Sequence, residues 1–370
     1  MSNLSRSLKE SWTLVEEQQD KLANYFYARM FLDDPQLRDL FPIQMDVQRS
    51  RLLGAIVTAV QTVDDPDRFG EYLESLGRDH RKFHVQPAHY DIVGRALLEA
   101  LRTFAGDQWT LEFDQAWRDA YAVIAARMIS GADADSANPP YWHAEVVHHE
   151  RRSRDIAVMT VRPMQPLEYR AGQYLSIECR NQPRLWRVYS VANAPREDGS
   201  LDFHVRAVGA GWVSSALVRR VQVGDMIRLG APMGSMTLDR GSTRDVVCVA
   251  GGTGLAPVKA LIEEMARANR TRWVHLFFGA KDRDDLYDLA CLNRLAADHP
   301  WLTVVTATTD DPDFPGEHGN VSEIVARHGP WRDHDFFVSG SPPMVRATLR
   351  ALAETQVPAI RIKYDVFGDS

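Results

Sequence analysis

The chain has 370 residues, with 43 Lys and Arg against 50 Asp and Glu, so its formal net charge is −7. At roughly 100–200 residues per domain, this length predicts two or three domains. A mildly acidic chain without long basic runs is a poor candidate for a nucleic-acid binder. No stretch is apolar enough to span a membrane, and the start MSNLSRSLKESW lacks the apolar segment of a signal peptide. We therefore expect a cytoplasmic protein without a nucleic-acid or membrane partner.

The three cysteines, Cys179, Cys248 and Cys291, lie far apart and form no CxxC pair. This spacing argues against a disulfide scaffold and a Cys-rich zinc site. It also excludes a plant-type or bacterial iron–sulfur cluster held by this chain alone, because such a cluster needs about four Cys ligands, more than the chain has.

Residues 1–134 carry apolar side chains at three- to four-residue spacing, which predicts an all-α domain. Ser7 followed by Glu10 resembles a capping box, so the first helix is expected to start there. Pro87 suits the first turn of a later helix.

Residues 131–140, rich in Gly, Ala, Asp and Pro, read as a linker. From 141 to 240 the apolar period becomes two, as in Leu201–Ala207, which predicts short strands in a small antiparallel β-barrel. From 241 to 370, short apolar runs alternate with helical stretches, the pattern of a parallel α/β sheet.

Two glycine-containing turns in the last domain each follow an apolar strand and open a helix: Gly251-Gly-Thr-Gly-Leu-Ala-Pro257 and Ser339-Gly-Ser-Pro-Pro-Met344. Glycine permits a phosphate to approach the backbone closely, and the N–H groups at a helix start favour an anion. Two such turns at strand ends of one sheet predict a dinucleotide crevice. The candidate residues are Gly251, Gly252, Thr253, Gly254, Pro257, Ser339 and Gly340.

The barrel carries Arg187-Val-Tyr-Ser190, a cation, an aromatic ring and a hydroxyl that suit a flavin dinucleotide. Arg187 would pair with the pyrophosphate, Tyr189 would stack on the ring system, and Ser190 would hydrogen-bond near its reactive nitrogen. The same alternation also fits an ordinary strand. Neighbouring candidates are Tyr174 in Tyr169-Arg-Ala-Gly-Gln-Tyr174, and Gly211, Val213 and Ser214 at an expected helix start.

These motifs, in this order, resemble the ferredoxin-reductase family, a flavin barrel followed by a nicotinamide domain, over residues 141–370. The resemblance implies FAD and NAD(P)H as cofactors, with Phe367 covering the flavin face that nicotinamide approaches. The family usually has Cys where Ser339 stands, which implies altered hydride transfer or coenzyme orientation. Such a module accepts a hydride and releases single electrons, so its partner must be a one-electron centre.

The helical domain is the candidate for that centre, because a haem needs only a ligand such as His. His80, His84 and His89 are the histidines before residue 140, and His80 and His84 are one helical turn apart. Either of these two is a possible ligand, although both also fit a polar helix end.

The segments Phe26–Phe31, Leu37–Pro42, Gln48–Leu52 and Pro87–Gly94, with His80 seven residues before Pro87, resemble the globin domain of flavohaemoglobins. The order of domains over almost all 370 residues is also that family's. The resemblance implies a haem b with His80 as the proximal iron ligand and His84 as its rival.

The same resemblance implies roles for further residues of the helical domain. The family's Glu that bonds the proximal histidine has no match in 129–133, where only the imperfectly placed Asp133 is acidic. Without a carboxylate hydrogen-bonded to it, the proximal imidazole donates less electron density to iron. Phe41 and Leu52 fit an ordinary helix core equally well. The implied roles are a distal polar pair (Tyr27, Gln48), a ring against the porphyrin (Phe41), an apolar distal residue (Leu52) and a proximal tyrosine (Tyr90).

The resemblance implies an oxidoreductase, a nitric oxide dioxygenase that passes electrons from NAD(P)H through FAD to the globin haem and converts nitric oxide and dioxygen to nitrate. The alternatives are a flavin reductase serving another acceptor and a haem gas sensor. Acidic residues in Phe278–Tyr287 favour NADH, although Lys281 and Arg283 would attract a 2′-phosphate. We expect small molecules as partners, and a monomer.

Overall fold

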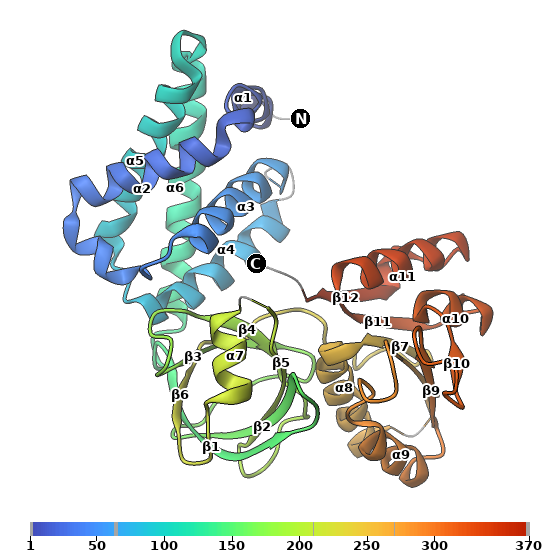
Figure 1. The fold of residues 1–370 in the computed structure, drawn as a ribbon. Helices are drawn as coiled ribbons and strands as arrows, with labels where there is room; N and C mark the ends of the chain where they lie inside the picture. The colour runs from blue at the N-terminus through green and yellow to red at the C-terminus, as the bar shows by residue number, and fades with distance from the viewer. Residues whose placement is uncertain (1–2, 63–65, 210, 270, 368–370) are drawn as a thin grey trace. The chain divides into compact units, whose positions relative to one another are not determined.

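The computed structural model describes residues 3–62, 66–209, 211–269 and 271–367 (Figure 1). It divides into two compact units, Met1–Tyr141 and Trp142–Asp369, which are described separately below. Within the described ranges, none of the helices has the length and apolar character needed to cross a bilayer.

The first unit is helical throughout, as its apolar period predicts. Pro87 occupies the first turn of a helix, as expected. The capping-box prediction is wrong, because Ser7 lies inside a helix that already includes Asn3, and its hydroxyl donates to Glu112 Oε1 at 3.1 Å. The helices are α1 (Asn3–Thr13), α2 (Gln19–Asp33), α3 (Asp46–Thr62), α4 (Pro66–His80), α5 (Pro87–Ala105) and α6 (Leu111–Ala134), with 3-10 turns η1 (Glu16–Gln18), η2 (Pro35–Leu40), η3 (Arg81–Phe83) and η4 (Gly106–Gln108).

Helices α4 and α6 pack with their backbones almost in contact. A Cβ on Gly77 of α4 would lie 1.9 Å from the carbonyl oxygen of Met128, and one on Gly131 of α6 would lie 2.1 Å from that of Glu74. Such distances are far inside van der Waals contact, so both positions require glycine. This crossing holds the last turn of α4, which ends at His80.

The second unit begins with an antiparallel six-stranded sheet in the order β4-β3-β6-β1-β2-β5. A bridge between Val191 and Phe203 joins its two edges, so the sheet is a nearly closed barrel. The expected alternation in β5 is incomplete, because Asp202 and His204 are buried along with their apolar neighbours. The elements are β1 (Trp142–Arg151), β2 (Ile156–Pro163), β3 (Tyr174–Cys179), β4 (Arg187–Ser190), β5 (Leu201–Arg206), α7 (Trp212–Arg219) and β6 (Met226–Leu229).

The same unit continues with a parallel sheet in the order β10-β9-β8-β7-β11-β12, with helices between its strands. The chain runs outward from β7 through β8 and β9, and then returns to place β11 on the other side of β7. The carboxyl ends of β7 and β11 therefore flank a topological switch point, where α/β sheets bind ligands. The elements are β7 (Val246–Gly251), η5 (Gly252–Gly254), α8 (Leu255–Ala268), β8 (Val274–Ala280), α9 (Leu289–Asp298), β9 (Leu302–Thr308), β10 (Glu317–His318), α10 (Val321–Arg327), β11 (Asp335–Gly340), α11 (Pro342–Glu354), η6 (Ala359–Arg361) and β12 (Ile362–Val366).

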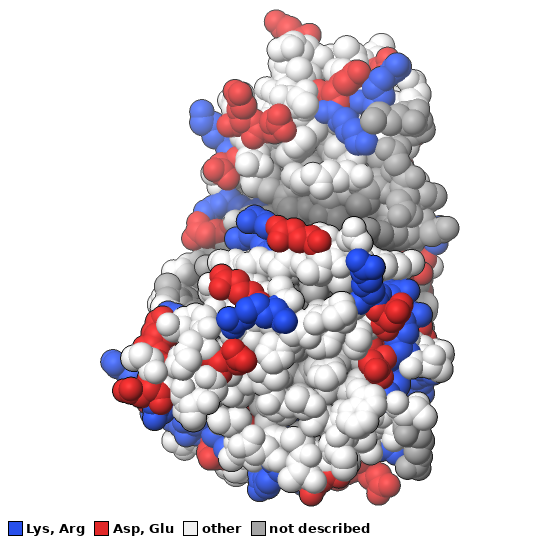
Figure 2. Space-filling model, turned by 90° about the vertical axis from the view of Figure 1, so that its right-hand side faces the viewer, with Lys and Arg blue, Asp and Glu red and all other residues white. Residues whose placement is uncertain are grey.

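On the described part of the face drawn in Figure 2, charged side chains of both signs are interspersed. There the positive charge that would attract a phosphate backbone is offset by nearby carboxylates.

Candidate functional site

His80, the last residue of α4, has one ring nitrogen engaged and one available. Its Nδ1 lies 2.8 Å from the Leu76 carbonyl oxygen one turn earlier. A carbonyl accepts a hydrogen bond but cannot donate one, so Nδ1 carries the proton and Nε2 keeps a lone pair. Burial also lowers the pKa of His80, which favours the neutral ring. A neutral imidazole held in this tautomer is the form that ligates a metal, so the residue fits the role of a haem ligand.

His84 does not share a helical face with His80, so that interpretation was wrong. Helix α4 ends at His80, and after the turn η3 the backbone of His84 is left-handed, with φ of 57°. Its ring is exposed and lies edge-on to Tyr141. His89 has a local role, because its Nδ1 accepts a hydrogen bond from the Gln86 amide at the start of α5.

Arg81, the residue after His80, connects the end of α4 to the segment after α6 through polar contacts. The Arg81 guanidinium forms an ion pair with the Asp135 carboxylate and donates to the carbonyl oxygens of Asp135 at 2.6 Å and Asn138 at 2.7 Å. The exposed Asp133 is not the partner of the His80 ring, whose Nδ1 bonds the Leu76 carbonyl.

Tyr27 of α2 points its hydroxyl at the start of α3. The hydroxyl donates to the backbone carbonyl of Gln48 at 3.0 Å, so the two residues of the predicted distal pair lie side by side. The Tyr27 ring packs against Phe41, with ring centroids 5.6 Å apart. Burial raises the pKa of Tyr27, so the hydroxyl keeps its proton and remains a hydrogen-bond donor.

The predicted distal and proximal residues belong to two different apolar clusters. Tyr27, Phe41 and Leu52 pack against the main core of the helical unit, whereas Tyr90 packs with the cluster around Leu73. Burial raises the pKa of Tyr90 to about 12, so it too remains protonated.

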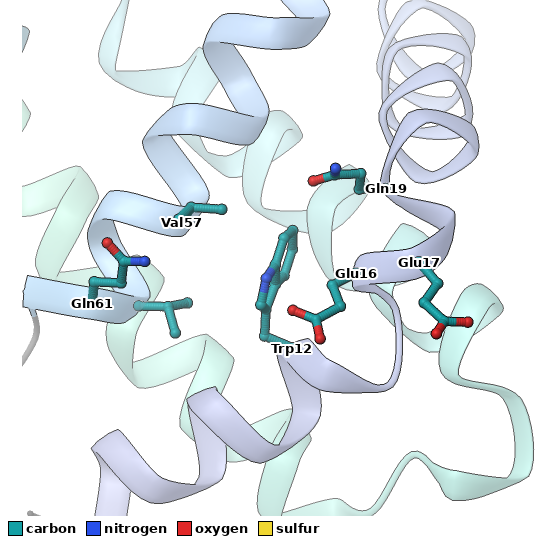
Figure 3. A pocket seen from close by; sticks show the side chains of 7 residues that line it. Trp12, Glu16, Glu17, Gln19, Val57 and Gln61 are labelled. Carbon is teal, nitrogen blue, oxygen red and sulfur yellow. The ribbon is translucent and has the colours of Figure 1, made fainter.

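A cavity of about 500 Å³ in the helical unit lies elsewhere. Figure 3 shows Val57 and Gln61 from α3 on one side of it, opposite Glu16, Glu17 and Gln19, with the Trp12 ring between them. Its lining includes none of the predicted haem residues, so it plays no part in the haem assignment.

The paired strands β3 and β4 carry the predicted flavin residues. Their register sets Tyr174 opposite Ser190 and Leu175 opposite Tyr189. The Tyr189 ring packs against the barrel core. The Arg187 guanidinium donates to the Trp186 carbonyl at 3.0 Å, and within the described residues no ion pair is recorded for it. Its charge is thus available to a phosphate.

The predicted pyrophosphate residues of the barrel surround the start of α7. Gly211 is the N-cap, and Val213 and Ser214 occupy the first turn, as the sequence predicts. A Cβ on Gly211 would lie 2.5 Å from the Ser214 hydroxyl oxygen, so glycine keeps the backbone accessible here. The first N–H groups of a helix lack partners within it and suit an anion.

The two glycine-containing turns of the nicotinamide domain lie against each other, as the sequence predicts. A Cβ on Gly254 would lie 2.3 Å from the Ser339 carbonyl oxygen, and one on Gly340 would lie 3.3 Å from the Gly251 backbone. The Ser339 hydroxyl is fully buried, and none of the described residues gives it a hydrogen-bond partner. An unsatisfied buried hydroxyl in a dinucleotide crevice fits a site that completes its hydrogen bonds with a ligand.

The chain end joins this crevice through β12. The Phe367 amide donates to the Gly340 carbonyl at 2.7 Å, which sets Phe367 beside the second turn. Asp365, which the motif analysis did not single out, pairs in register with Ser339, and burial raises its pKa to about 6. Sequence reasoning also missed Arg206, whose guanidinium lies near the first turn, because on the strand pattern it was only an outward polar residue.

Comparisons with known proteins agree with this three-part organisation. Residues 24–128 match the family described as Globin, residues 143–238 the oxidoreductase FAD-binding domain, and residues 248–350 the oxidoreductase NAD-binding domain. A flavohemoprotein of Bacillus subtilis is 28% identical over 98% of this chain and 96% of its own length. The chain belongs to the flavohaemoglobin family.

Two further relatives bear on parts of this flavohaemoglobin. A flavohemoglobin of Malassezia yamatoensis, solved with bound FAD and heme, has the same fold, with a TM-score of 0.84 and 22% identity over 100% of this chain and 99% of its own. The ferredoxin–NAD(P)+ reductase component of a Pseudomonas putida naphthalene 1,2-dioxygenase system is 33% identical over 60% of this chain and 67% of its own length. The flavohaemoglobin is therefore an oxidoreductase whose domains support electron transfer from NAD(P)H through FAD to haem.

Proposed function

We propose that this flavohaemoglobin is a nitric oxide dioxygenase that uses NAD(P)H, preferably NADH, to convert nitric oxide and dioxygen to nitrate in the cytoplasm. The observation that carries the proposal is the His80 ring, held by the Leu76 carbonyl so that Nε2 is left for a haem iron, in one chain with a flavin and nicotinamide reductase. A haem domain joined to a reductase can supply both reduced iron and electrons for repeated turnover, and the oxidation of nitric oxide by dioxygen needs both.

Haem, FAD and NAD(P)H, when bound, supply an iron that reacts with small gases, a carrier that splits an electron pair, and a hydride. The protein's part is to hold and shield them. His80 would ligate the iron, and the Leu76 carbonyl keeps its tautomer. Phe41 and Leu52 would exclude water from the distal side.

The Tyr27 hydroxyl is the proposed donor to a bound gas. It keeps its proton because burial raises its pKa; that proton is donated to the Gln48 carbonyl and would turn from it toward the gas. A positioned donor of this kind stabilises negative charge that develops on an oxygen ligand. Gln48 would assist through its side chain, since its backbone carbonyl holds the Tyr27 hydroxyl.

The reductase unit would bind its two nucleotides on separate surfaces. Arg187, Tyr189 and Ser190 would hold the flavin, together with the start of α7. The touching turns at Gly251–Gly254 and Ser339–Gly340 would hold the nicotinamide coenzyme, with Phe367 at their edge. The acidic side chains in the segment Phe278–Tyr287 would repel a 2′-phosphate, which favours NADH.

Anaerobic stopped-flow spectroscopy followed by a nitric oxide assay tests the proposal. We expect NADH to reduce the flavin and then the haem, and oxygenated protein to consume nitric oxide and form stoichiometric nitrate over many turnovers. Flavin reduction without haem reduction would instead assign a reductase for another acceptor. Reversible gas binding without turnover would assign a sensor. Faster reduction by NADPH than by NADH would overturn the coenzyme preference.

A further inference from the structure

Arg206 lies where the barrel meets the first phosphate turn of the nicotinamide domain. It is the last residue of β5, and its guanidinium Nη1 is 3.7 Å from the position that a Cβ on Gly252 would occupy. Gly252 has a left-handed backbone, with φ of 54°, and opens the turn that leads into α8. A cation at this distance reaches any anion that binds to the backbone of the turn.

Two aspartates from different parts of the unit hold this guanidinium. Nε lies 3.4 Å from Asp155 Oδ2 of the barrel, and Nη2 pairs with Asp285 Oδ1 of the nicotinamide domain. The Arg206 and Asp285 side chains are 27% and 19% exposed, so their interaction is only partly screened by solvent. One guanidinium thus presents separate N–H groups to Asp285 and to the turn.

Asp285 is itself held in position by its own loop. Its amide N–H donates to Asp282 Oδ1 at 3.0 Å, and the Asp284 amide does the same. The loop joins β8 to α9, beside the carboxyl end of β7. An anion at Gly252 would therefore meet both the Arg206 cation and the Asp285 carboxylate that neutralises it.

We propose that Arg206 binds the pyrophosphate of the nicotinamide coenzyme and that Asp285 competes with that pyrophosphate for the guanidinium. Planar guanidinium groups bind carboxylates and phosphates through the same fork of N–H donors, so the two anions exchange on one cation. Asp285 holds Arg206 in place when the crevice is empty and weakens coenzyme affinity when it is filled. This assignment rests on the proposed use of NAD(P)H.

Binding of ADP-ribose to the fully loaded flavohaemoglobin tests the assignment, since this probe carries the pyrophosphate but no hydride. We expect Arg206→Gln to weaken ADP-ribose binding in calorimetry by about tenfold or more, the effect of losing a charge-assisted hydrogen bond. Arg206→Lys, which keeps the charge, should recover part of the affinity. In stopped-flow experiments the same Arg206→Gln change should raise the NADH concentration for half-maximal flavin reduction more than it lowers the limiting rate.

Asp285→Asn supplies a prediction of the opposite sign, which misfolding cannot imitate. We expect it to tighten ADP-ribose binding severalfold. The matched control is Arg240→Gln, which breaks the exposed Arg240–Glu264 ion pair of the same unit and should leave affinity unchanged. Unaltered ADP-ribose affinity in Arg206→Gln, or weaker affinity in Asp285→Asn, would overturn the assignment. Absence of nitric oxide turnover would refute the proposed function and leave these affinities intact.

Discussion

At the scale of single residues, two histidines that look equivalent in the sequence have different environments. His80 ends α4 with its ring oriented by a backbone carbonyl, whereas His84 is exposed beyond a left-handed turn. The difference comes from where the helix stops, because the left-handed residue turns the chain away from the face that carries His80.

This difference predicts the effect of removing each ring. We expect His80→Ala to abolish the haem Soret band while FAD absorbance remains, because the neighbouring His84 ring is exposed and does not share the helical face of His80. His84→Ala should retain both bands. Absorbance spectra of the purified variants after haem supplementation decide the matter, and haem lost from His84→Ala but kept by His80→Ala would reverse the ligand assignment.

At the candidate site, the residue types indicate a possible chemistry, but they did not predict the contacts that these residues make. Ser7 forms part of a capping-box pattern but lies inside α1, and the hydrogen bond from Tyr27 to the Gln48 backbone was not predicted. The pairing of Arg206 with Asp285 joins residues 79 positions apart. Such contacts depend on helix starts, rotamers and tertiary packing, which local sequence patterns do not encode.

At the scale of elements, the crossing of α4 and α6 is the most demanding contact of the helical unit. Both backbones occupy the space that a side chain at Gly77 or Gly131 would need. The apolar period predicted these helices, and it also predicted the strands of both sheets. It did not predict which helices cross closely, because glycine in a helix equally marks an exposed position such as Gly54.

Gly77→Ala should therefore destabilise the helical unit by about 3 kcal/mol or more, since its Cβ would collide with the Met128 carbonyl. Gly54→Ala is the matched control. Nothing lies within 4 Å of a Cβ there, so the higher helix propensity of alanine should raise stability by up to about 1 kcal/mol. Urea unfolding followed by far-UV circular dichroism and the Soret band measures both, and equal stabilities would contradict the close crossing.

At the scale of the whole molecule, a buried polar contact joins the two halves of the reductase unit. His204 of the barrel bonds the Tyr287 hydroxyl of the nicotinamide domain at 2.8 Å, next to the buried Lys259–Asp288 ion pair within that domain. The sequence predicted the order of the three domains but not this joint. A buried histidine in a strand reads as an ordinary outward polar residue until its tertiary partner, here the Tyr287 hydroxyl, is known.

The His204 joint makes the reductase unit sensitive to acid. Burial, with Lys259 and Arg152 nearby, lowers the pKa of His204 well below 6.5. The unfolded chain takes up a proton near pH 6.5 that the folded chain does not, so stability is present above that pH and falls as pH falls below it. We expect a loss of up to about 1.4 kcal/mol per pH unit from this residue.

His204→Phe should remove that part of the pH dependence, because phenylalanine keeps a ring and does not titrate. Urea unfolding curves followed by flavin fluorescence between about pH 7 and about pH 5 measure the slope. The control is His148→Phe, at an exposed position on β1. An unchanged slope in His204→Phe would show that the acid sensitivity arises elsewhere.

The Arg81 contacts have a consequence for how this protein is dissected. Helix α6 ends at Ala134, which makes that residue an obvious place to cut out the globin part. Such a fragment would lack the carboxylate and both carbonyl oxygens that Arg81 binds at Asp135 and Asn138. The polypeptide next to His80, the proposed haem ligand, would then be unanchored. Fragments intended to report native gas affinities should extend at least to Asn138.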